Sequence, residues 1–431
     1  MTRLRPDDDL SPRQGGTGAS GDQRPRTSAV FYGWWVVAAA GIAIFLAAGV
    51  RAAPGVFLLP IEEDLAIDRS VVSFAVALGL LVYGLTAPVS GKLIDRVGPR
   101  LVAVAGLLVV GVSMLLSAAA QDALQLCLFF GILGGIGTGL LGSVLGAVIA
   151  NRWFVARRGL VVGIFGATVS AGQLVFLPAL AGLTASIGWR QTSVWMAVAA
   201  VVLAVPVALL VRNDPSDMGV APLGGVAAAP TPPDRGIMRR AVRRVDFWLL
   251  VGTFGVCGLT SNGIVGTHFI AHAVEHGFTE TVAAGTLAVM GLFNFAGTIA
   301  SGWLTDRFDP RRLLLWFYGF RGISLFLVPV IHDRLGLVAF AVLFGLDYIA
   351  TVPPTVALAA DAFGRQNVGT VYGWVFASHQ AGAALAAWGG GFIREQTGDY
   401  AVAFLAAGVM AVLAGLATIA IRTARTTHAP A

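Results

Sequence analysis

The chain has 431 residues, of which 56% are hydrophobic and only 12% are charged, and its mean hydropathy is +0.79. A soluble protein carries about 25% charged residues, so this composition excludes an ordinary soluble domain and predicts that the bilayer is the solvent. The formal net charge of +6 does not indicate a nucleic-acid partner, because the positions of the basic residues follow a membrane topology.

The chain begins with a polar segment, residues 1–28, which is rich in Pro, Gly, Asp and Arg and is predicted to be disordered. The first apolar run starts only near Val30 and no cleavage site accompanies it, so we expect no cleaved signal peptide. About twelve apolar segments long enough to span a bilayer follow. Their approximate centres are residues 45, 80, 110, 138, 172, 202, 260, 292, 321, 348, 380 and 411.

A polar, proline-containing stretch separates the sixth segment from the seventh and ends in the basic run RGIMRRAVRRVDFW. Such a run is typical of a helix that lies on the membrane face. The predicted organisation is a cytoplasmic tail at 1–28, a six-helix bundle at 29–212, a cytoplasmic linker at 213–245, a second six-helix bundle at 246–422 and a cytoplasmic tail at 423–431.

One charged connector occurs twice, as GKLIDRVGPR at 91–100 and as GWLTDRFDPR at 302–311. The copies lie about half a chain length apart, and each follows an apolar run. A duplicated half with a charged connector at the same place is typical of a transporter built from two related helical bundles. The repeated residues are Gly91, Asp95 and Arg96 in the first copy and Gly302, Asp306 and Arg307 in the second.

The basic residues determine the expected topology. If the amino terminus is cytoplasmic, 23 Lys and Arg lie on the inner side and four lie on the outer side. Positive charge is retained in the cytoplasm, so this asymmetry predicts that both termini are cytoplasmic. We expect a multi-pass protein of the plasma (inner) membrane.

From residue 30 onward the chain resembles the major facilitator superfamily, on the evidence of the two connectors. The resemblance implies an all-α membrane protein with twelve transmembrane helices in two pseudo-symmetric six-helix bundles. It also implies that Asp95 lies near the start of helix eleven and Asp306 near the start of helix five, where the helix dipole is positive. The connector residues would then gate the conformational cycle; the alternative is a solvated loop that only sets topology.

The segment RWFVARRGLVVGIFGATVSAG at 152–172 resembles the fifth-helix signature of monocarboxylate carriers and oxalate/formate-type antiporters, and the stretch 49–64 is similar to bacterial members of that group. Vertebrate monocarboxylate carriers have an Asp and an Arg in helix eight, where this chain has Asn294 and Thr298. The arginine of helix four and the Gly-Pro motif of helix five that typify drug/proton antiporters are missing. The resemblance therefore implies a small organic anion as substrate.

Arg51 lies in the predicted first helix, and an ionisable group near the bilayer centre costs roughly 2.5–3.5 kcal/mol on insertion scales. Its guanidinium suits a carboxylate through bidentate hydrogen bonds, so Arg51 is a candidate substrate ligand. Alternatively it pairs with an acid of the segment Glu62-Glu63-Asp64 or extends outward to the interface.

Arg321 and Asp347 lie mid-helix in the predicted helices nine and ten, at similar depth. We expect a buried structural ion pair. The alternative makes Asp347 a proton carrier, since loss of its partner would raise its pKa. In helix ten, Pro353 and Pro354 predict either a hinge or a static kink.

The predicted helix seven ends with three histidines, His268, His272 and His276. His268 and His276 are about 12 Å apart along a helix, too far to share one ion, although His268 and His272 could share one. No further ligand set is evident in the sequence, and we expect no metal. His268 is the deepest and is a candidate for substrate hydrogen bonding or proton relay.

Together these features predict a secondary active transporter of a small, monocarboxylate-like organic anion that works by alternating access with proton coupling, as a monomer in the lipid bilayer. No Gly-x-x-x-x-Gly-Lys loop is present, and no cofactor or enzymatic activity is expected. Alternatives are an exporter or exchanger of another small metabolite, or a membrane solute sensor. The candidate substrate-binding residues are Arg51, His268, Asn294, His379, Gln173 and Tyr348, with Asn262 and Gln380 as weaker candidates, and the proton-coupling candidates are Asp347 and His268.

Overall fold

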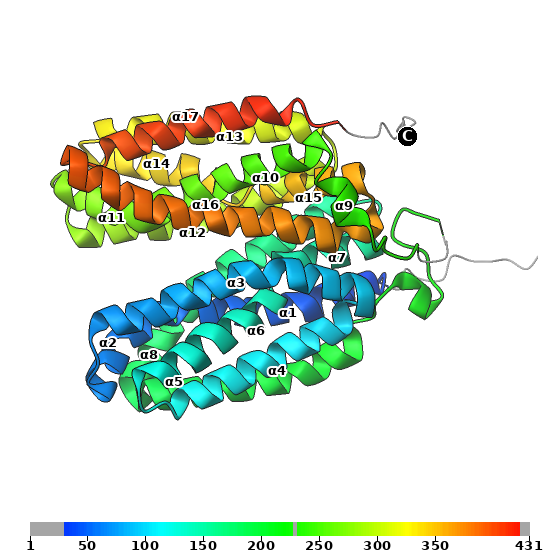
Figure 1. Ribbon diagram of the computed structural model, residues 1–431, viewed down its shortest axis with the longest axis horizontal. Coiled ribbons are helices and arrows are strands. Elements are labelled where there is room, and N and C mark those ends of the chain that lie inside the picture. The colour runs from blue at the N-terminus through cyan, green and yellow to red at the C-terminus, as the bar shows by residue number, and fades with distance from the viewer. Residues whose placement is uncertain (1–29, 227–230, 423–431) are drawn as a thin grey trace, which may run out of the picture. The chain divides into compact units, whose positions relative to one another are not determined.

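The computed structural model describes residues 30–226 and 231–422. The tails predicted at 1–28 and 423–431 lie outside the described residues. From Tyr32 onward the described chain packs as one unit, and its regular elements are helices. Figure 1 shows two groups of helices, with α1 to α8 in one and α10 to α17 in the other.

The first group contains α1 and α2, which are separated by one residue, and then helices of very different lengths. In chain order these elements are α1 (Gly33–Ala52), α2 (Pro54–Leu65), α3 (Arg69–Val97), α4 (Pro99–Ala118), α5 (Ala123–Leu126), the π-helical turn η1 (Cys127–Leu133), α6 (Gly134–Leu140), α7 (Ser143–Trp153) and α8 (Arg158–Leu210).

Two short elements of the linker, η2 (Pro215–Met218) and α9 (Ile237–Ala241), lead to the second group. That group consists of α10 (Val245–Gly258), the π-helical turn η3 (Leu259–Val265), α11 (Gly266–Glu275), α12 (Glu280–Thr305), α13 (Pro310–Leu327), η4 (Val328–Val330), α14 (Arg334–Asp347), α15 (Val352–Phe363), η5 (Arg365–Asn367), α16 (Val368–Thr397) and α17 (Ala401–Thr418).

The described residues contain ten helical stretches that are long and apolar enough to span a membrane. One of them, α8, is too long for a single crossing and contains Gly188 at φ 80°, a left-handed conformation that glycine adopts without strain, so it supplies helices five and six. The polar residues Ser378, His379 and Gln380 lower the hydropathy of α16, which supplies helix eleven. The fold therefore has the twelve expected transmembrane helices in two six-helix bundles.

Helix ten is broken between α14 and α15, and Pro353 and Pro354 lie in the first turn of α15. Proline is tolerated in a first turn, where backbone N–H groups lack partners anyway. Because Pro354 has no N–H, the carbonyl of Ala350 is free to accept from elsewhere, and the Ser301 hydroxyl of α12 donates to it. The break is thus stabilised by a neighbouring helix.

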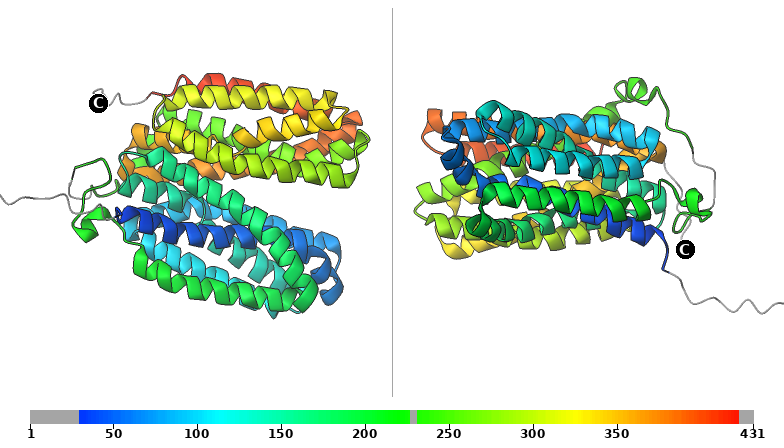
Figure 2. Two further views of the ribbon diagram at one scale, coloured as in Figure 1. Left: turned by 180° about the vertical axis from the view of Figure 1, so that it is seen from behind. Right: turned by 90° about the horizontal axis from the view of Figure 1, so that it is seen from below.

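The two bundles meet along two pairs of helices, α8 with α12 and α3 with α16. Both charged connectors lie at the same end of the molecule, the end at which α9 and the described carboxyl end also lie (Figures 1 and 2). We call it the connector end, defined by residues 91–100 and 302–311.

Candidate functional site

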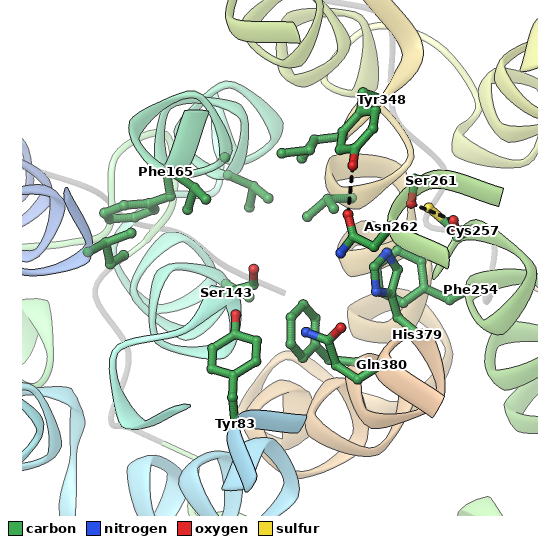
Figure 3. Close-up of a pocket in the computed structure, with 18 of the residues that line it drawn as sticks. Tyr83, Ser143, Phe165, Phe254, Cys257, Ser261, Asn262, Tyr348, His379 and Gln380 are labelled. Carbon is green, nitrogen blue, oxygen red and sulfur yellow. Dashed lines mark hydrogen bonds between the residues drawn. The ribbon is translucent and has the colours of Figure 1, made fainter. Parts of the chain in front are cut away.

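A cavity of about 150 Å³ lies between the two bundles and receives side chains from both. Figure 3 shows Tyr83 and Ser143 on one side of it and residues of η3, α14–α15 and α16 on the other. The polar residues that line the cavity are Arg51, Tyr83, Ser143, Gln173, Cys257, Ser261, Asn262, Tyr348, His379 and Gln380.

Arg51, in the last turn of α1, is the fixed cation of this cavity wall. Its guanidinium carbon lies 4.9 Å from the centre of the Tyr83 ring, a cation–π contact. Two of the acids that could have neutralised it have other partners, since Glu62 pairs with Arg69 at 2.9 Å and Asp64 pairs with Arg190 at 2.6 Å. Among the described residues no acid forms an ion pair with Arg51, so its N–H groups remain available to an anion.

The opposite wall carries neutral polar groups. The Tyr348 hydroxyl donates to Asn262 Oδ1 at 2.8 Å, which joins α14–α15 to the π-helical turn η3. The ring of His379 stacks on Phe376, with centroids 5.8 Å apart and an interplanar angle of 5°. Its Nδ1 atom is buried and has no hydrogen-bond partner among the described residues. This wall can therefore donate hydrogen bonds to a bound ligand without adding a fixed charge.

Four of the six predicted substrate-binding residues, Arg51, Gln173, Tyr348 and His379, line this cavity, and two do not. His268 Nε2 is bonded to the Ala387 carbonyl at 2.9 Å, and Asn294 Nδ2 donates to Ser170 Oγ at 2.8 Å between the bundles.

Several lining residues carried no sequence signal. Tyr83, Ser143 and Ser261 are common residue types in membrane helices, and nothing in their spacing marks the helix face that they occupy. The weaker candidates Asn262 and Gln380 do line the cavity, since their side chains lie on the inner faces of η3 and α16. A polar residue within a membrane helix was the only available signal for these two.

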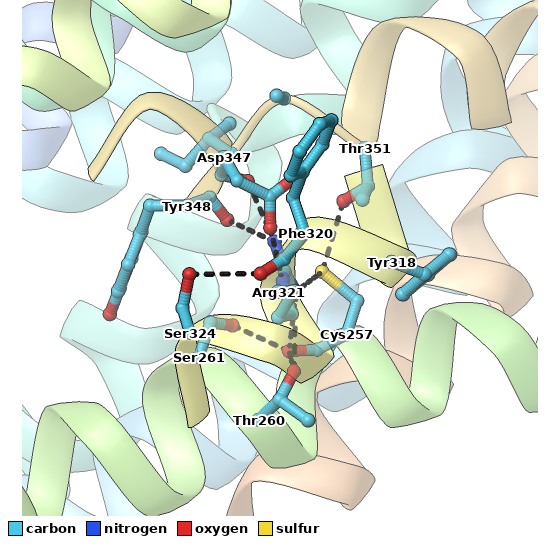
Figure 4. Close-up of polar contacts among 12 residues, drawn as sticks. Cys257, Thr260, Ser261, Tyr318, Phe320, Arg321, Ser324, Asp347, Tyr348 and Thr351 are labelled. Atoms are coloured by element: carbon cyan, nitrogen blue, oxygen red, sulfur yellow. Dashed lines mark hydrogen bonds and ion pairs between the residues drawn. The ribbon is translucent and has the colours of Figure 1, made fainter. Parts of the chain in front are cut away.

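Arg321 lies fully buried behind the cavity in α13, at the centre of the network in Figure 4. Its Nε donates to Asp347 Oδ2 at 2.6 Å, and its Nη2 donates to the carbonyls of Asp347 at 2.7 Å and of Tyr348 at 3.1 Å. Its Nη1 contacts Cys257 Sγ at 3.0 Å and Thr260 Oγ1 at 3.2 Å. Through these hydrogen bonds Arg321 connects the break in helix ten with the start of η3.

The connector acids contact the first turns of helices from the opposite bundle. Asp95 Oδ2 accepts from the backbone N–H and the hydroxyl of Thr370 in α16, both at 2.7 Å. Asp306 accepts from the N–H groups of Gly159 at 2.6 Å and Leu160 at 2.8 Å in α8. These are helices eleven and five, and their positive dipole ends favour the carboxylates. Burial raises the pKa of the Asp306 carboxyl, and the two amide donors oppose this rise.

Further contacts hold the bundles together at the connector end. Arg158 Nη2 lies 3.3 Å from Asp361 Oδ1, and Arg365 donates to the carbonyls of Asn151 and Phe154. Burial lowers the pKa of Arg365 to about 10. The glycines of the connectors allow the close approach, since a Cβ at Gly302 would lie 2.5 Å from the Gly159 carbonyl oxygen. The connector end is therefore closed in this structure.

A family model of the Major Facilitator Superfamily matches residues 40–346 and 263–431. Human Monocarboxylate transporter 11 is 30% identical over 401 residues, which cover 89% of this chain and 82% of that protein. The Oxalate:formate antiporter of Oxalobacter formigenes is 24% identical over 372 residues, covering 83% of each chain. The solved structure of the proton:xylose symporter XylE has a TM-score of 0.69 at 16% identity, covers 91% of this chain and 96% of that chain, and shows the fold alone.

The chain belongs to the Major Facilitator Superfamily. It is a multi-pass integral membrane protein and a transporter of small molecules, not an enzyme. The resemblance to monocarboxylate carriers and oxalate/formate antiporters that the segment 152–172 indicated is confirmed by the named relatives.

Proposed function

We propose that this protein moves a small, monocarboxylate-like organic anion across the plasma membrane by alternating access, with protons as the coupling ion. The observation that carries the proposal is Arg51, a cation that faces the cavity between the bundles with no acidic partner among the described residues. A guanidinium in a site of low dielectric binds a carboxylate through two parallel hydrogen bonds.

The size and polarity of the cavity support a small ligand. A volume of about 150 Å³ suits a few non-hydrogen atoms, and aromatic rings of Tyr83, Phe254 and Phe376 form part of the wall. Such a wall suits the hydrocarbon part of a short carboxylate, while the hydroxyl of Ser143 and the amide of Gln173 supply neutral hydrogen bonds.

The named relatives support the same class of substrate, since they include a monocarboxylate transporter and an antiporter of oxalate and formate. The latter name favours exchange of two carboxylates as a second candidate mode. Asn294 and Thr298 stand where vertebrate carriers have charged residues. The Thr298 hydroxyl donates to the Asn294 carbonyl at 2.7 Å, and Asn294 donates to Ser170 of α8, so both side chains are engaged within the protein. The carboxylate would therefore rely on Arg51.

Alternating access would proceed by breaking the contacts of Asp95 with Thr370 and of Asp306 with Gly159 and Leu160. With this topology, 23 Lys and Arg lie on the side of the connectors and four lie on the other side. This asymmetry supports the assignment of the connector end and both termini to the cytoplasm. We propose a monomer, because each chain contains both bundles and the cavity between them.

For proton coupling, Asp347 and His268 remain the candidates. Asp347 Oδ1 is buried and has no hydrogen-bond partner among the described residues, so it could hold a proton when Arg321 moves away. His268 lies outside the cavity, where its ring is bonded to the Ala387 carbonyl. A role in proton coupling would therefore require a proton path from this position to the substrate.

The test is uptake of labelled small monocarboxylates into proteoliposomes, with and without an inside-alkaline pH gradient. Gradient-driven accumulation supports proton-coupled transport, whereas uptake that requires an internal carboxylate supports exchange. Accumulation of either kind excludes a sensor that does not transport. If folded protein takes up none of the panel, the carboxylate assignment is wrong.

A further inference from the structure

We propose that His272, His276 and Asp399 form a binding site for a divalent transition-metal ion of the Zn²⁺ type, at the end of the molecule opposite the connectors. His272 lies in the last turn of α11, His276 directly follows that helix, and Asp399 lies in the loop between α16 and α17. One potential ligand atom from each residue lies within 4.8 Å of the other two. The site is separate from the cavity and from the proposed substrate.

A hydrogen bond of the His276 ring leaves its other nitrogen available to bind a metal ion. Its Nδ1 lies 2.9 Å from the backbone carbonyl oxygen of His272, and a carbonyl oxygen can only accept, so Nδ1 carries the proton. The neutral ring then presents the lone pair of Nε2, which lies 3.9 Å from Asp399 Oδ2. A histidine held through its other nitrogen in this way is the usual arrangement at a metal centre.

His272 supplies the buried part of the site. Its side chain is only 4% exposed and packs against Phe404, with ring centroids 4.9 Å apart. Neither of its ring nitrogens has a hydrogen-bond partner of ordinary geometry among the described residues. Its Nδ1 faces Asp399 Oδ1 at 3.7 Å. A buried imidazole without such a partner, close to a carboxylate and a second imidazole, is poorly satisfied unless a cation binds between them.

Asp399 provides the negative charge and is held in place by its own loop. Its Oδ1 accepts from the backbone N–H of Ala401 at 3.1 Å, and the Thr397 hydroxyl donates to the Asp399 carbonyl at 2.9 Å. The nearby Arg394 is engaged by Glu275 at 3.0 Å. Within the described part of the chain, the two histidines are the only basic residues within ion-pair distance of Asp399.

Two imidazoles and one carboxylate form a three-ligand set that Zn²⁺ accepts with a fourth position open to water. Bond lengths of about 2.0–2.2 Å require the three ligand atoms to draw closer together. Asp399 is 42% exposed and His276 is 21% exposed, so both side chains can rotate and an ion can reach them from solvent. This ligand set could not be predicted from the sequence, because Asp399 lies far along the chain from the histidines.

A bound ion would join the end of α11 to the loop that precedes α17. Because α11 continues directly from η3, which carries Asn262 of the cavity wall, the ion would restrain the outer half of helix seven.

The test uses full-length protein without an affinity tag, since tags bind Zn²⁺, and measures Zn²⁺ binding by calorimetry and the visible absorption of Co²⁺. We expect one saturable site that excludes Mg²⁺, with His276→Ala and Asp399→Asn each weakening binding at least about tenfold. His272→Ala should do the same if it folds. His332→Ala, an exposed histidine of a loop before α14, is the matched control and should bind as wild type does.

Each outcome decides the question. Wild-type binding that is lost in His276→Ala and Asp399→Asn, in protein with an unchanged melting temperature, establishes the site. Absence of saturable binding, or binding that these variants leave unchanged, overturns it. Since no transport is measured, the result is independent of the proposed substrate.

Discussion

Two arginines within the helical bundles, the fully buried Arg321 and the partly exposed Arg51, differ in their surroundings. Arg321, in the second bundle, directs all its donor groups to protein partners, including Asp347 and the carbonyls at the break in helix ten. Arg51, in the first bundle, contacts a ring of Tyr83 and lines the cavity. The same side chain thus forms an internal connection in one bundle, whereas in the other it lines a cavity without an acidic partner among the described residues.

The difference separates a stabilising role from a binding role. A guanidinium with every donor satisfied has nothing left to offer a ligand, whereas one at a cavity wall without a counter-ion gains from binding an anion. Changes at Arg321 should therefore affect folding, and changes at Arg51 should affect transport.

The largest effect is expected from Arg321→Met, which leaves Asp347 buried without its partner. Removing one member of a buried ion pair costs about 3–5 kcal/mol, so the melting temperature in detergent and the yield of folded protein should fall sharply. Replacing Asp347 as well, in Arg321→Met/Asp347→Leu, should recover part of the loss. A single variant as stable as wild type would contradict the structural role.

Arg51→Gln should fold normally but transport poorly. Hydrogen bonds to a charged group contribute about 1.5–3 kcal/mol, so uptake at low substrate concentration should fall roughly tenfold to a hundredfold. Labelled-carboxylate uptake by proteoliposomes measures this, with the melting temperature as the folding control. Unchanged uptake would remove Arg51 from the site.

The connector acids should influence the conformational equilibrium by a smaller amount. Asp306→Asn removes a charge from the start of α8, an interaction of about 1 kcal/mol, so the open fraction at the connector end should rise roughly fivefold. Single-molecule fluorescence between probes on α8 and α12 reports this fraction. Asp309→Asn is the matched control, because Asp309 pairs with Arg311 of its own helix. Equal effects of both changes would argue against a gate.

The smallest effect is expected at the break in helix ten. Ser301→Ala removes the hydrogen bond to the Ala350 carbonyl and should lower stability by about 0.5–1.5 kcal/mol, measured by thermal unfolding. Ser324→Ala is the control, since the one hydrogen bond of the Ser324 hydroxyl among the described residues goes to the Phe320 carbonyl of its own helix. A loss of stability in Ser301→Ala that is no greater than the loss in Ser324→Ala would show that the break needs no support from α12.

The fold was accessible from sequence, because hydropathy and an internal repeat report directly on membrane crossings. The contacts of the connectors were expected only from the resemblance to the superfamily. The proximity of Arg321 and Asp347 was also accessible, since each is a charge at similar depth in an apolar helix. The helix face that a polar residue occupies was harder to predict. His268 looked deep enough to reach a central site, yet it bonds to α16 at Ala387.

Other features depend on contacts between distant segments, for which one sequence provides no signal. Tyr83 lines the cavity because of the way α3 is rotated about its axis, and Ser143 lines it because α7 begins at this residue. The approach of Asp399 to His272 depends on the loop between α16 and α17. Spacing within a helix predicts neither arrangement.

The most direct test of the central claim is equilibrium binding of a labelled short carboxylate and of its neutral amide to purified wild-type and Arg51→Gln protein. The two ligands have nearly the same size and differ in charge. We predict that wild type prefers the acid and that Arg51→Gln loses this preference while its melting temperature is unchanged. Equal preference for the acid in both proteins would contradict the account.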